Sequence, residues 1–239
     1  MSKWVFVAGI YRSGSTTQYE MCRDIVQETG NGIGIGYHTE QRLKDNDDSK
    51  HNFVVCKVFE PLFIGFRDKP SYAKKFFNEN RVKAIATMRD PRDVITSMKK
   101  RSEGRKEDGT NGKWSFRATA QTNFPIWFSN LDKWFDWGAM KTKYEDMILI
   151  TEEKNGLYNE CKRIANHLNI KANDDLLKEI ASRYTVESII KRKQKDKGAL
   201  PSRPAIVFGT SGINKTWLTV PERRMVEKSV GWFIEKYGY

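Results

Sequence analysis

The chain has 239 residues, of which 38% are hydrophobic, and its formal net charge is +12. This composition excludes a disordered chain and is sufficient for a packed core, so we expect one domain spanning residues 1–239. The positive charge favours anionic partners. The sequence has neither the aromatic strand signature nor the zinc-ligand spacing of common nucleic-acid-binding modules, so we expect no nucleic acid partner.

Membrane and secretory features are also missing from the sequence. No apolar run approaches the ~20 residues that span a bilayer, and a strand pattern beginning by Trp4 leaves no room for a signal peptide. Cys22, Cys56 and Cys161 are widely spaced and form no CxxC pair, which predicts reduced, buried thiols. We therefore expect a cytoplasmic protein with no membrane partner, and we leave its oligomeric state open.

Short apolar runs alternate with helical patterns along the first part of the chain. The runs that predict parallel strands are Trp4–Ile10, Gly32–Tyr37, Phe53–Phe59 and Val82–Met88. This alternation is typical of an α/β fold, a three-layer α/β/α arrangement with a central, mostly parallel sheet.

The helices are predicted from apolar stripes and from residues typical of helix ends. Tyr19, Cys22, Ile25 and Val26 form one stripe, and Gly30 follows where a helix would end. Further expected elements are the helices Pro70–Asn80, Pro91–Arg101, Gly156–Leu168 and Val220 to about Tyr237, and a weaker strand, Ala139–Tyr144. Thr219 and Glu222 have capping-box spacing. The polar segments Ser102–Lys113 and Lys191–Pro204 are predicted to be exposed loops.

The segment Val5–Thr17, VFVAGIYRSGSTT, runs from a strand through a glycine-containing turn into a helix. Gly9, Gly14 and Thr16 match the phosphate-binding template G-x-x-x-x-G-K-[ST], but Ser15 occupies the lysine position. In nucleotide hydrolases that lysine reaches the β- and γ-phosphates. Its loss argues against a triphosphate ligand, while the backbone cradle still predicts a 5′-phosphorylated one.

Several other polar residues follow the predicted strands directly. Ligands of an open parallel sheet bind beyond the carboxyl ends of its strands. His38 and Glu40 follow the second strand, Glu60 the third and Arg89 the fourth. We expect these residues and the first loop to share one rim.

The segment after the fourth strand, MRDPRDVITSMKK, combines helix-start signals with two further polar residues. Asp90 suits an N-cap, Pro91 the first turn, and Asp93 the positive end of the helix dipole. Arg89 and Ser97 are not needed for this role. Their spacing of eight residues could bracket a second phosphate.

Taken together, GIYRSGSTT and RDPRDVITS resemble the two nucleotide signatures of the sulfotransferases that use 3′-phosphoadenosine-5′-phosphosulfate (PAPS). KYEDM at Lys143–Met147 and TSGINKTW at Thr210–Trp217 resemble two further motifs of that family. The resemblance implies a P-loop-like sulfotransferase fold. It also implies PAPS as donor, adenosine 3′,5′-bisphosphate (PAP) as product, and no metal. The expected reaction is direct in-line transfer of a sulfonate to a hydroxyl or amine.

The resemblance also implies roles for individual residues. The first loop would bind the 5′-phosphosulfate, with the cation of Arg12 near the leaving group. Arg89 and Ser97 would bind the 3′-phosphate, Tyr144 would help to hold the nucleotide, and the TSGINKTW segment would close over the 3′-phosphate. The complete set of expected donor-binding residues is Tyr11, Arg12, Ser13, Gly14, Ser15, Thr16, Thr17, Arg89, Ser97, Tyr144, Thr210, Ser211, Gly212 and Lys215.

Three residues are candidates for the catalytic base. Lys57 lies in VVCKVFEP, which resembles a family stretch where a catalytic histidine follows the lysine two residues later, but here that position is Phe59. Lys57 could stabilise the transferring sulfonate, or serve only as a salt-bridge partner. For the base we place His38 first, Glu40 second and Glu60 third.

The acceptor is expected to be a small molecule. Phe116–Trp137 is rich in aromatic residues at near-helical spacing. We expect most of these rings to pack in the core and one or two to line an acceptor pocket, with Ser102–Lys113 as its lid. The competing hypotheses are a P-loop kinase or nucleotide hydrolase, and a nucleotide-binding or nucleic-acid-binding protein without sulfotransfer activity.

Overall fold

The computed structural model describes residues 2–47, 50–58, 72–107, 114–149, 151, 154–195 and 211–239. The chain divides into two compact units. One, the sheet unit, comprises Met1–Met88 and Asn130–Tyr184; the other, the helical unit, comprises Arg89–Ser129 and Thr185–Tyr239. The expectation of a single domain remains a prediction.

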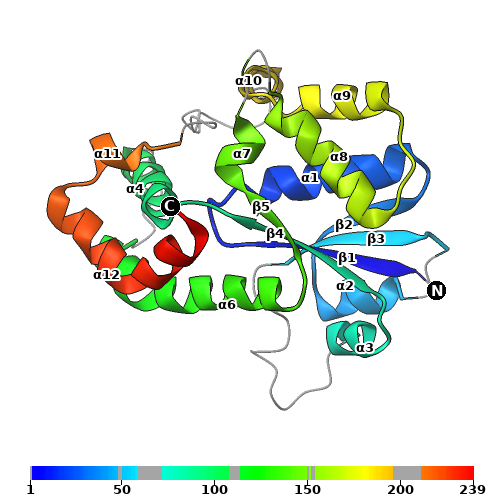
Figure 1. Cartoon of the computed structure of the whole chain (residues 1–239), viewed down its shortest axis with the longest axis horizontal. Helices are drawn as coiled ribbons and strands as arrows, with labels where there is room; N and C mark the ends of the chain where they lie inside the picture. The colour runs from blue at the N-terminus through cyan, green and yellow to red at the C-terminus, as the bar shows by residue number, and fades with distance from the viewer. Residues whose placement is uncertain are drawn as a thin grey trace. The chain divides into compact units, whose positions relative to one another are not determined.

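The sheet unit contains five parallel strands in the order β2-β3-β1-β4-β5 (Figure 1). Their bounds are β1 Lys3–Gly9, β2 Gly32–Tyr37, β3 Phe53–Val58, β4 Val82–Met88 and β5 Met140–Lys143. The predicted parallel sheet is confirmed. The predicted strand Ala139–Tyr144 was too long at both ends, because Tyr144 already begins helix α7 (Tyr144–Ile148).

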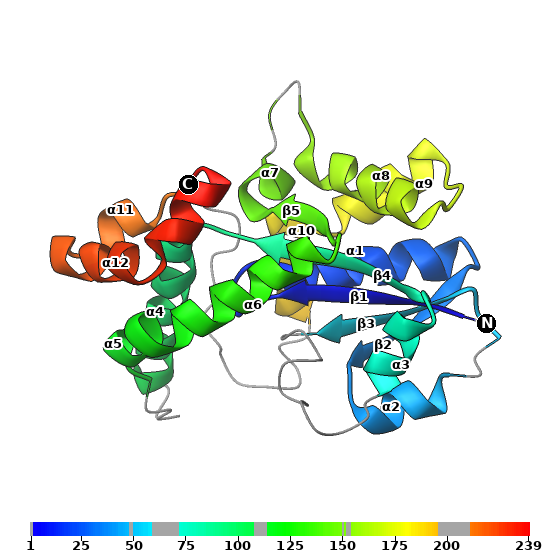
Figure 2. The ribbon, with the colours of Figure 1, turned by 60° about the horizontal axis from the view of Figure 1, so that its bottom comes forward.

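The central strands β1 and β3 read as nearly continuous apolar runs because the sheet is covered on both faces. Figure 2 shows helices α1 (Ser15–Glu28), α8 (Gly156–Leu168) and α9 (Asp174–Ser182) on one face, with α2 (Glu40–Asp45) and α3 (Tyr72–Asn78) on the other. On the first face, Val5 and Val7 share a buried cluster with residues of α1, α8 and α9. On the second, the Trp4 ring stacks on Phe76 of α3, with ring centroids 4.4 Å apart. The predicted α/β/α layering is therefore confirmed.

All three cysteines are buried and form no disulfide, as predicted. Burial raises the pKa of the Cys22 thiol, because the thiolate would lose its hydration. These thiols act as small apolar side chains in the core.

The helical unit is built around α4 (Pro91–Glu107) and α12 (Val220–Tyr237). Its other elements are α5 (Phe116–Ala118), the π-helical turn η1 (Thr119–Asn123), the first part of α6 (Phe124–Asp136), α10 (Val186–Lys195) and α11 (Asn214–Trp217). Phe128 packs on Phe233 of α12, with ring centroids 4.6 Å apart. The predicted capping box of Thr219 and Glu222 is present at the start of α12. None of the helices within the described ranges is long and apolar enough to cross a bilayer.

Both predicted loops were wrong in part. Helix α4 continues through residues 102–107, and α10 continues through residues 191–195. Lys, Arg and Glu are good helix formers, so the polar composition of these segments is compatible with a helix as well as with a loop. Ser102 is buried and belongs to the packed side of α4. The remaining parts, 108–113 and 196–204, lie outside the described residues.

The aromatic segment forms α6, as its spacing predicts. Phe124, Phe128 and Trp134 have no exposed surface, and Leu131 and Phe135 are nearly as buried. The prediction that most of these rings pack in the core is confirmed.

Candidate functional site

The loop between β1 and α1 makes a tight turn whose backbone is bent in an unusual way. Arg12 has a φ of 66° and Gly14 a φ of 90°, a region that residues other than glycine seldom adopt. Ser13 has no exposed surface, and its Oγ donates to the carbonyl of Ile10 at 2.8 Å. This buried hydroxyl helps hold the turn in its shape.

Two glycines of this loop are required by close neighbours. A Cβ on Gly9 would lie 2.6 Å from the Cβ of Ser15, and one on Gly14 would lie 2.3 Å from Cδ2 of Tyr144. Both distances are shorter than real carbon contacts. Gly14 is thus packed under the ring of Tyr144, which joins the first loop to the KYEDM segment.

The N-terminus of α1 is open to a ligand. Its N-cap is Gly14, which has no side chain that could cap the helix, and its first turn carries no acidic residue. The first N–H groups of a helix have no partner within the helix, and the helix dipole adds positive potential there. Such an end is suited to binding a phosphate or sulfate group.

The predicted donor-binding residues of this loop differ in exposure. Ser13 and Ser15 are buried, Arg12 and Thr17 are half-buried, and Tyr11 and Thr16 are exposed. The buried serines shape the loop. The exposed groups are accessible to a ligand.

Lys57 extends from β3 to the loop. Its side chain is only 6% exposed, and its Nζ donates to Oγ1 of Thr16. The ammonium group also lies 4.9 Å from the centre of the Tyr37 ring, a distance at which a cation is attracted to an aromatic face. The structure therefore brings the predicted catalytic lysine to the predicted phosphate loop.

His38 lies just beyond β2, next to the same lysine. Its backbone N–H donates to the Lys57 carbonyl at 3.1 Å, and its Nδ1 lies 3.4 Å from that oxygen. Burial lowers the pKa of His38, while this contact and the charge of Glu40 act in the opposite direction. The imidazole is therefore neutral near pH 7.

Of the other base candidates, Glu40 is exposed on the first turn of α2, after the N-cap Thr39, whose side chain accepts from the N–H of Arg42. Glu60 lies outside the described residues.

A bulge at the end of β2 sets where His38 emerges. The pairing of β2 with β3 shifts between Gly34 and Tyr37, and the N–H of Gly36 donates to Oη of Tyr19 at 2.7 Å. Bulges of this kind redirect side chains at strand ends. Sequence reasoning read Tyr19 only as part of an apolar stripe, because its hydroxyl partner is a backbone group on another element.

The remaining donor-binding candidates lie in the helical unit, except for Tyr144. Arg89 and Ser97 are both buried, at 6% and 7% exposure, and Asp90 between them accepts from the N–H of Arg92 at 2.8 Å as the predicted N-cap. Ser211 and Lys215 are exposed, and Gly212 has a φ of 76°. Thr210 lies outside the described residues.

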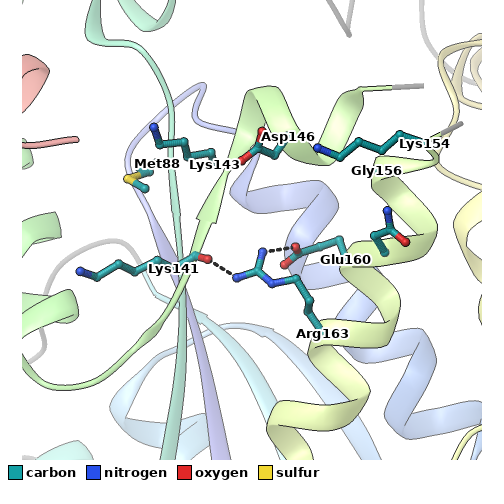
Figure 3. Close-up of a pocket in the computed structure, with 9 residues that line it drawn as sticks. Met88, Lys141, Lys143, Asp146, Lys154, Gly156, Glu160 and Arg163 are labelled. Carbon is teal, nitrogen blue, oxygen red and sulfur yellow. Dashed lines mark hydrogen bonds and ion pairs between the residues drawn. The ribbon is translucent and has the colours of Figure 1, made fainter. Parts of the chain in front are cut away.

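A pocket of about 400 Å³ opens beside β5 and α8 in the sheet unit (Figure 3). None of the predicted site residues that the structure describes lines it. Glu160, one of its lining residues, accepts from Gln18 at 2.7 Å and from Thr142 at 2.6 Å, and pairs with Arg163. This carboxylate therefore joins α8 to α1 and β5. Among the residues that the structure describes, no cluster of His, Cys, Asp or Glu is arranged to hold a metal ion.

Comparison with known proteins supplies a family. The model of the sulfotransferase domain matches residues 2–230. A mouse sulfotransferase, SULT7A1, solved in complex with PAP, is similar in fold, with a TM-score of 0.64 at 14% identity over 98% of this chain and 89% of the other. A retinol dehydratase solved with retinol and PAP has a TM-score of 0.62 at 17% identity, covering 97% and 81% of the two chains. No curated protein matches the chain in sequence.

Proposed function

This chain belongs to the sulfotransferase family, and we propose which of its residues bind the donor and which carry out the transfer. The enzyme transfers a sulfonate group from PAPS to an acceptor and releases PAP. The observation that carries the residue assignments is the contact of Lys57 with the open, glycine-lined N-terminus of α1.

The first loop binds the 5′-phosphate of the donor. Backbone N–H groups from Gly14 to Thr17 supply hydrogen bonds, and the helix dipole favours the negative charge. Bound PAPS supplies an activated sulfonate joined to this phosphate by a bridging oxygen. Arg12, in the same turn, stabilises the negative charge that develops on the leaving phosphate.

Lys57 stabilises the transferring sulfonate. Its ammonium group is nearly buried, where a charge interacts more strongly than in water. Thr16 and the Tyr37 ring orient it. A fixed cation in this position requires little reorganisation during the transfer.

His38 is the base that receives the acceptor's proton. Donation from Nδ1–H to the Lys57 carbonyl leaves the lone pair at Nε2 available. As the acceptor oxygen or nitrogen forms its bond to sulfur, its proton passes to Nε2 and the S–O bond to the phosphate breaks. Glu40 is the second candidate and Glu60 the third.

The 3′-phosphate is recognised by residues of the helical unit. Arg89 supplies a cation and Ser97 a hydroxyl, and the segment containing Ser211, Gly212 and Lys215 closes over the phosphate with a second cation, as the family resemblance implies. Thr210 and Tyr144 complete the proposed donor-binding set. The packing of Tyr144 on Gly14 supports a place for this ring beside the donor.

For the acceptor we propose a small molecule with a hydroxyl or amine. The retinol dehydratase of similar fold was also solved with androsterone, at a TM-score of 0.59 and 16% identity over 97% and 80% of the two chains. For the location we propose the cytoplasm, because three free, buried thiols are typical of a reducing compartment.

The test is to incubate the protein with PAPS and a panel of hydroxylated and amino compounds and to follow both products by mass spectrometry. We expect one acceptor to gain one sulfonate for each PAP released. If PAP is released at the same rate in the presence of each acceptor as in the absence of any acceptor, this result would contradict the proposal that the enzyme transfers sulfonate to a small molecule.

A further inference from the structure

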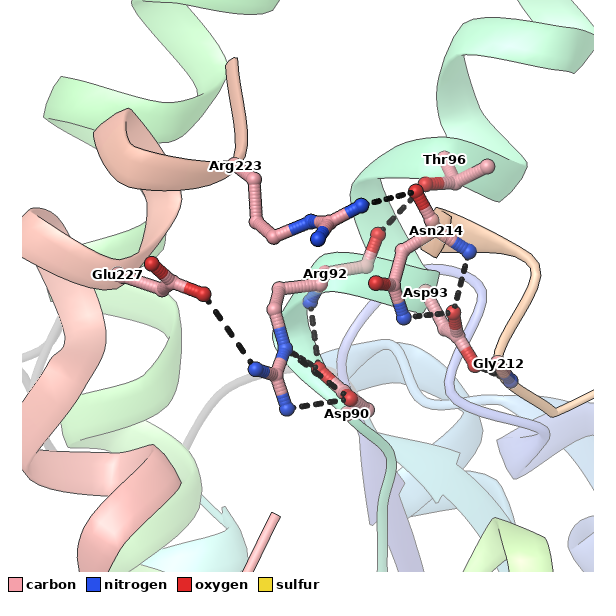
Figure 4. A network of polar contacts seen from close by, with 8 residues as sticks. All are labelled: Asp90, Arg92, Asp93, Thr96, Gly212, Asn214, Arg223 and Glu227. Carbon is pink, nitrogen blue, oxygen red and sulfur yellow. Dashed lines mark hydrogen bonds and ion pairs between the residues drawn. The ribbon is translucent and has the colours of Figure 1, made fainter. Parts of the chain in front are cut away.

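Asp93 of α4 holds the backbone of a segment more than a hundred residues further along the chain. Its side chain has no exposed surface. One carboxylate oxygen accepts from the N–H of Gly212 at 2.6 Å; the other accepts from the N–H of Asn214 at 2.9 Å and from its side-chain Nδ2 at 2.6 Å (Figure 4). The predicted role of Asp93 as a helix-dipole partner therefore missed its main contacts.

The same segment contacts α4 again at its other end. Nζ of Lys100 lies 3.9 Å from the centre of the Trp217 ring, and Nζ of Lys99 lies 3.4 Å from the Trp217 carbonyl. Asp93, Ser97 and Lys100 are spaced four and three residues apart, which places them on one face of the helix. Ser97 thus lies on the face of α4 that residues 211–217 contact.

Helix α12 contacts the segment as well. Nη2 of Arg223 lies 3.4 Å from the carbonyl of Asn214 (Figure 4). It lies at the same distance, 3.4 Å, from the carbonyl of Lys215. The contacts of Asp93 are shorter, and they involve a buried carboxylate, so they are the stronger ones. Asp93 therefore contributes most to fixing residues 212–214.

We propose that Asp93 is a positioning residue for recognition of the donor's 3′-phosphate. It holds the turn Gly212–Asn214 against α4, so that the Lys215 cation, which directly follows the turn, is directed to the phosphate that Ser97 also binds. Asp93 itself does not touch the donor, because a carboxylate beside a phosphate would repel it. This inference rests on the proposed assignment of Ser97 and residues 211–215 to that phosphate.

The test compares PAP with 5′-AMP, which lacks the 3′-phosphate. In Asp93→Asn, one oxygen becomes an NH₂ group that faces N–H donors, so the turn loses its anchor. Hydrogen bonds to charged groups are strong enough that we expect PAP affinity to fall about tenfold or more, measured by calorimetry. The affinity for 5′-AMP should remain within about twofold, since the phosphate loop is unchanged.

The matched control is Asp90→Asn, the same substitution in the same turn of α4. Asp90 bonds to Arg92 within its own helix. This change should lower the melting temperature but leave the ratio of the two affinities as in the wild type. A purely structural role of Asp93 would give the two variants the same ratio.

A second variant keeps the test decisive if Asp93→Asn does not fold. Asn214→Ala removes one donor to Asp93 and leaves the carboxylate and both backbone bonds in place. We expect a smaller, selective loss of PAP affinity and faster amide exchange in residues 212–217. An unchanged affinity ratio in Asn214→Ala and in any folded Asp93→Asn protein would overturn the inference.

The wild-type protein separates this inference from the proposed function. If it binds PAP no better than 5′-AMP, the assignment of a 3′-phosphate site fails. If it prefers PAP but the variants retain that preference, only the role of Asp93 fails.

Discussion

The Nζ of Lys57 donates a hydrogen bond to Oγ1 of Thr16. A residue of β3 therefore contacts the first turn of α1, at the end of the phosphate loop. The two residues lie 41 positions apart in the sequence. They meet because β3 pairs directly with β1, which ends in the loop. The proposed mechanism depends on this contact, because it places a buried cation at the open end of α1.

Replacing Lys57 with methionine should slow the transfer step much more than it weakens donor binding. The substitution keeps the length of the side chain and removes its charge, which acts mainly in the transition state. Loss of one such group typically lowers kcat by roughly 10²–10³-fold. We expect the Kd for PAP to change by less than about threefold.

The matched control is Lys162→Met, the same substitution at an exposed lysine of α8. It removes a surface charge from another element. It should leave kcat unchanged. Equal losses of kcat and PAP affinity in Lys57→Met would instead assign the lysine to ground-state binding.

His38→Ala should abolish the acidic limb of the pH–rate profile. The neutral imidazole accepts the proton, so kcat/KM of the wild type should fall as the pH drops through the pKa of His38. Because burial lowers that pKa, this fall should occur below the ordinary value of 6.5. Loss of a general base typically lowers kcat by about 10²–10⁴-fold, and PAP binding should stay intact.

Glu40→Gln distinguishes the second candidate. If His38 is the base, this variant should keep most of its activity. Its acidic limb should shift to slightly lower pH, because the Glu40 charge raises the pKa of His38. A large loss in Glu40→Gln with near-normal activity in His38→Ala would transfer the role of base to Glu40.

Arg89→Ala should weaken PAP much more than 5′-AMP. A charge-assisted hydrogen bond to the 3′-phosphate contributes substantially to the binding free energy, so we expect the affinity for PAP to fall about 10–100-fold. Binding of 5′-AMP depends on the first loop and should change little. Titration of both nucleotides into the same preparation measures the ratio directly, and parallel losses would give Arg89 a different role.

Gly14→Ala should damage the phosphate loop. The new Cβ would overlap the Tyr144 ring, and φ at this position is left-handed, so we expect a destabilisation of at least about 3 kcal/mol together with loss of PAP binding. Gly138→Ala is the control: Gly138 has a similar φ of 81°, but apart from its chain neighbours no described residue has an atom within 4 Å of its Cβ position. In chemical denaturation, Gly138→Ala should lower the free energy of unfolding by only about 1–2 kcal/mol. It should leave PAP binding unchanged.

The strands and most helices could be predicted because buried positions recur in the sequence with a spacing that is typical of each element. Phe53–Val58 is buried on both faces and reads as a short apolar run, and Gly156–Leu168 has a clear stripe that matched α8 to the residue. The extensions of α4 and α10 were missed, because a polar stretch rich in Lys, Arg and Glu can form either a helix or a loop. The strand order 2-3-1-4-5 depends on pairings between distant segments, which no local pattern encodes.

The residues of the candidate site were also predictable where a local motif marks them, and not where they depend on contacts between distant segments. The glycines and the open end of α1 were predictable, because a phosphate loop has a local motif. The contact of Lys57 with Thr16 was not predicted, because the sequence indicated for Lys57 only a role in stabilising the sulfonate or in a salt bridge. Asp93 and Tyr19 were read through their immediate neighbours, whereas their partners are backbone groups on other elements. Every residue has a backbone N–H or carbonyl group, so no particular residue type in the sequence marks the partner of such a contact.

The central claim is that the loop and its partners bind a 3′-phosphorylated adenosine nucleotide rather than a triphosphate. The most direct test measures the melting temperature with a saturating concentration of PAP and, separately, of ATP with Mg²⁺. A ligand that binds only the folded state stabilises it by RT ln(1 + [L]/Kd), so the tighter ligand gives the larger shift. We predict a clear rise with PAP and little or none with ATP; a larger shift with ATP and Mg²⁺ would contradict the account.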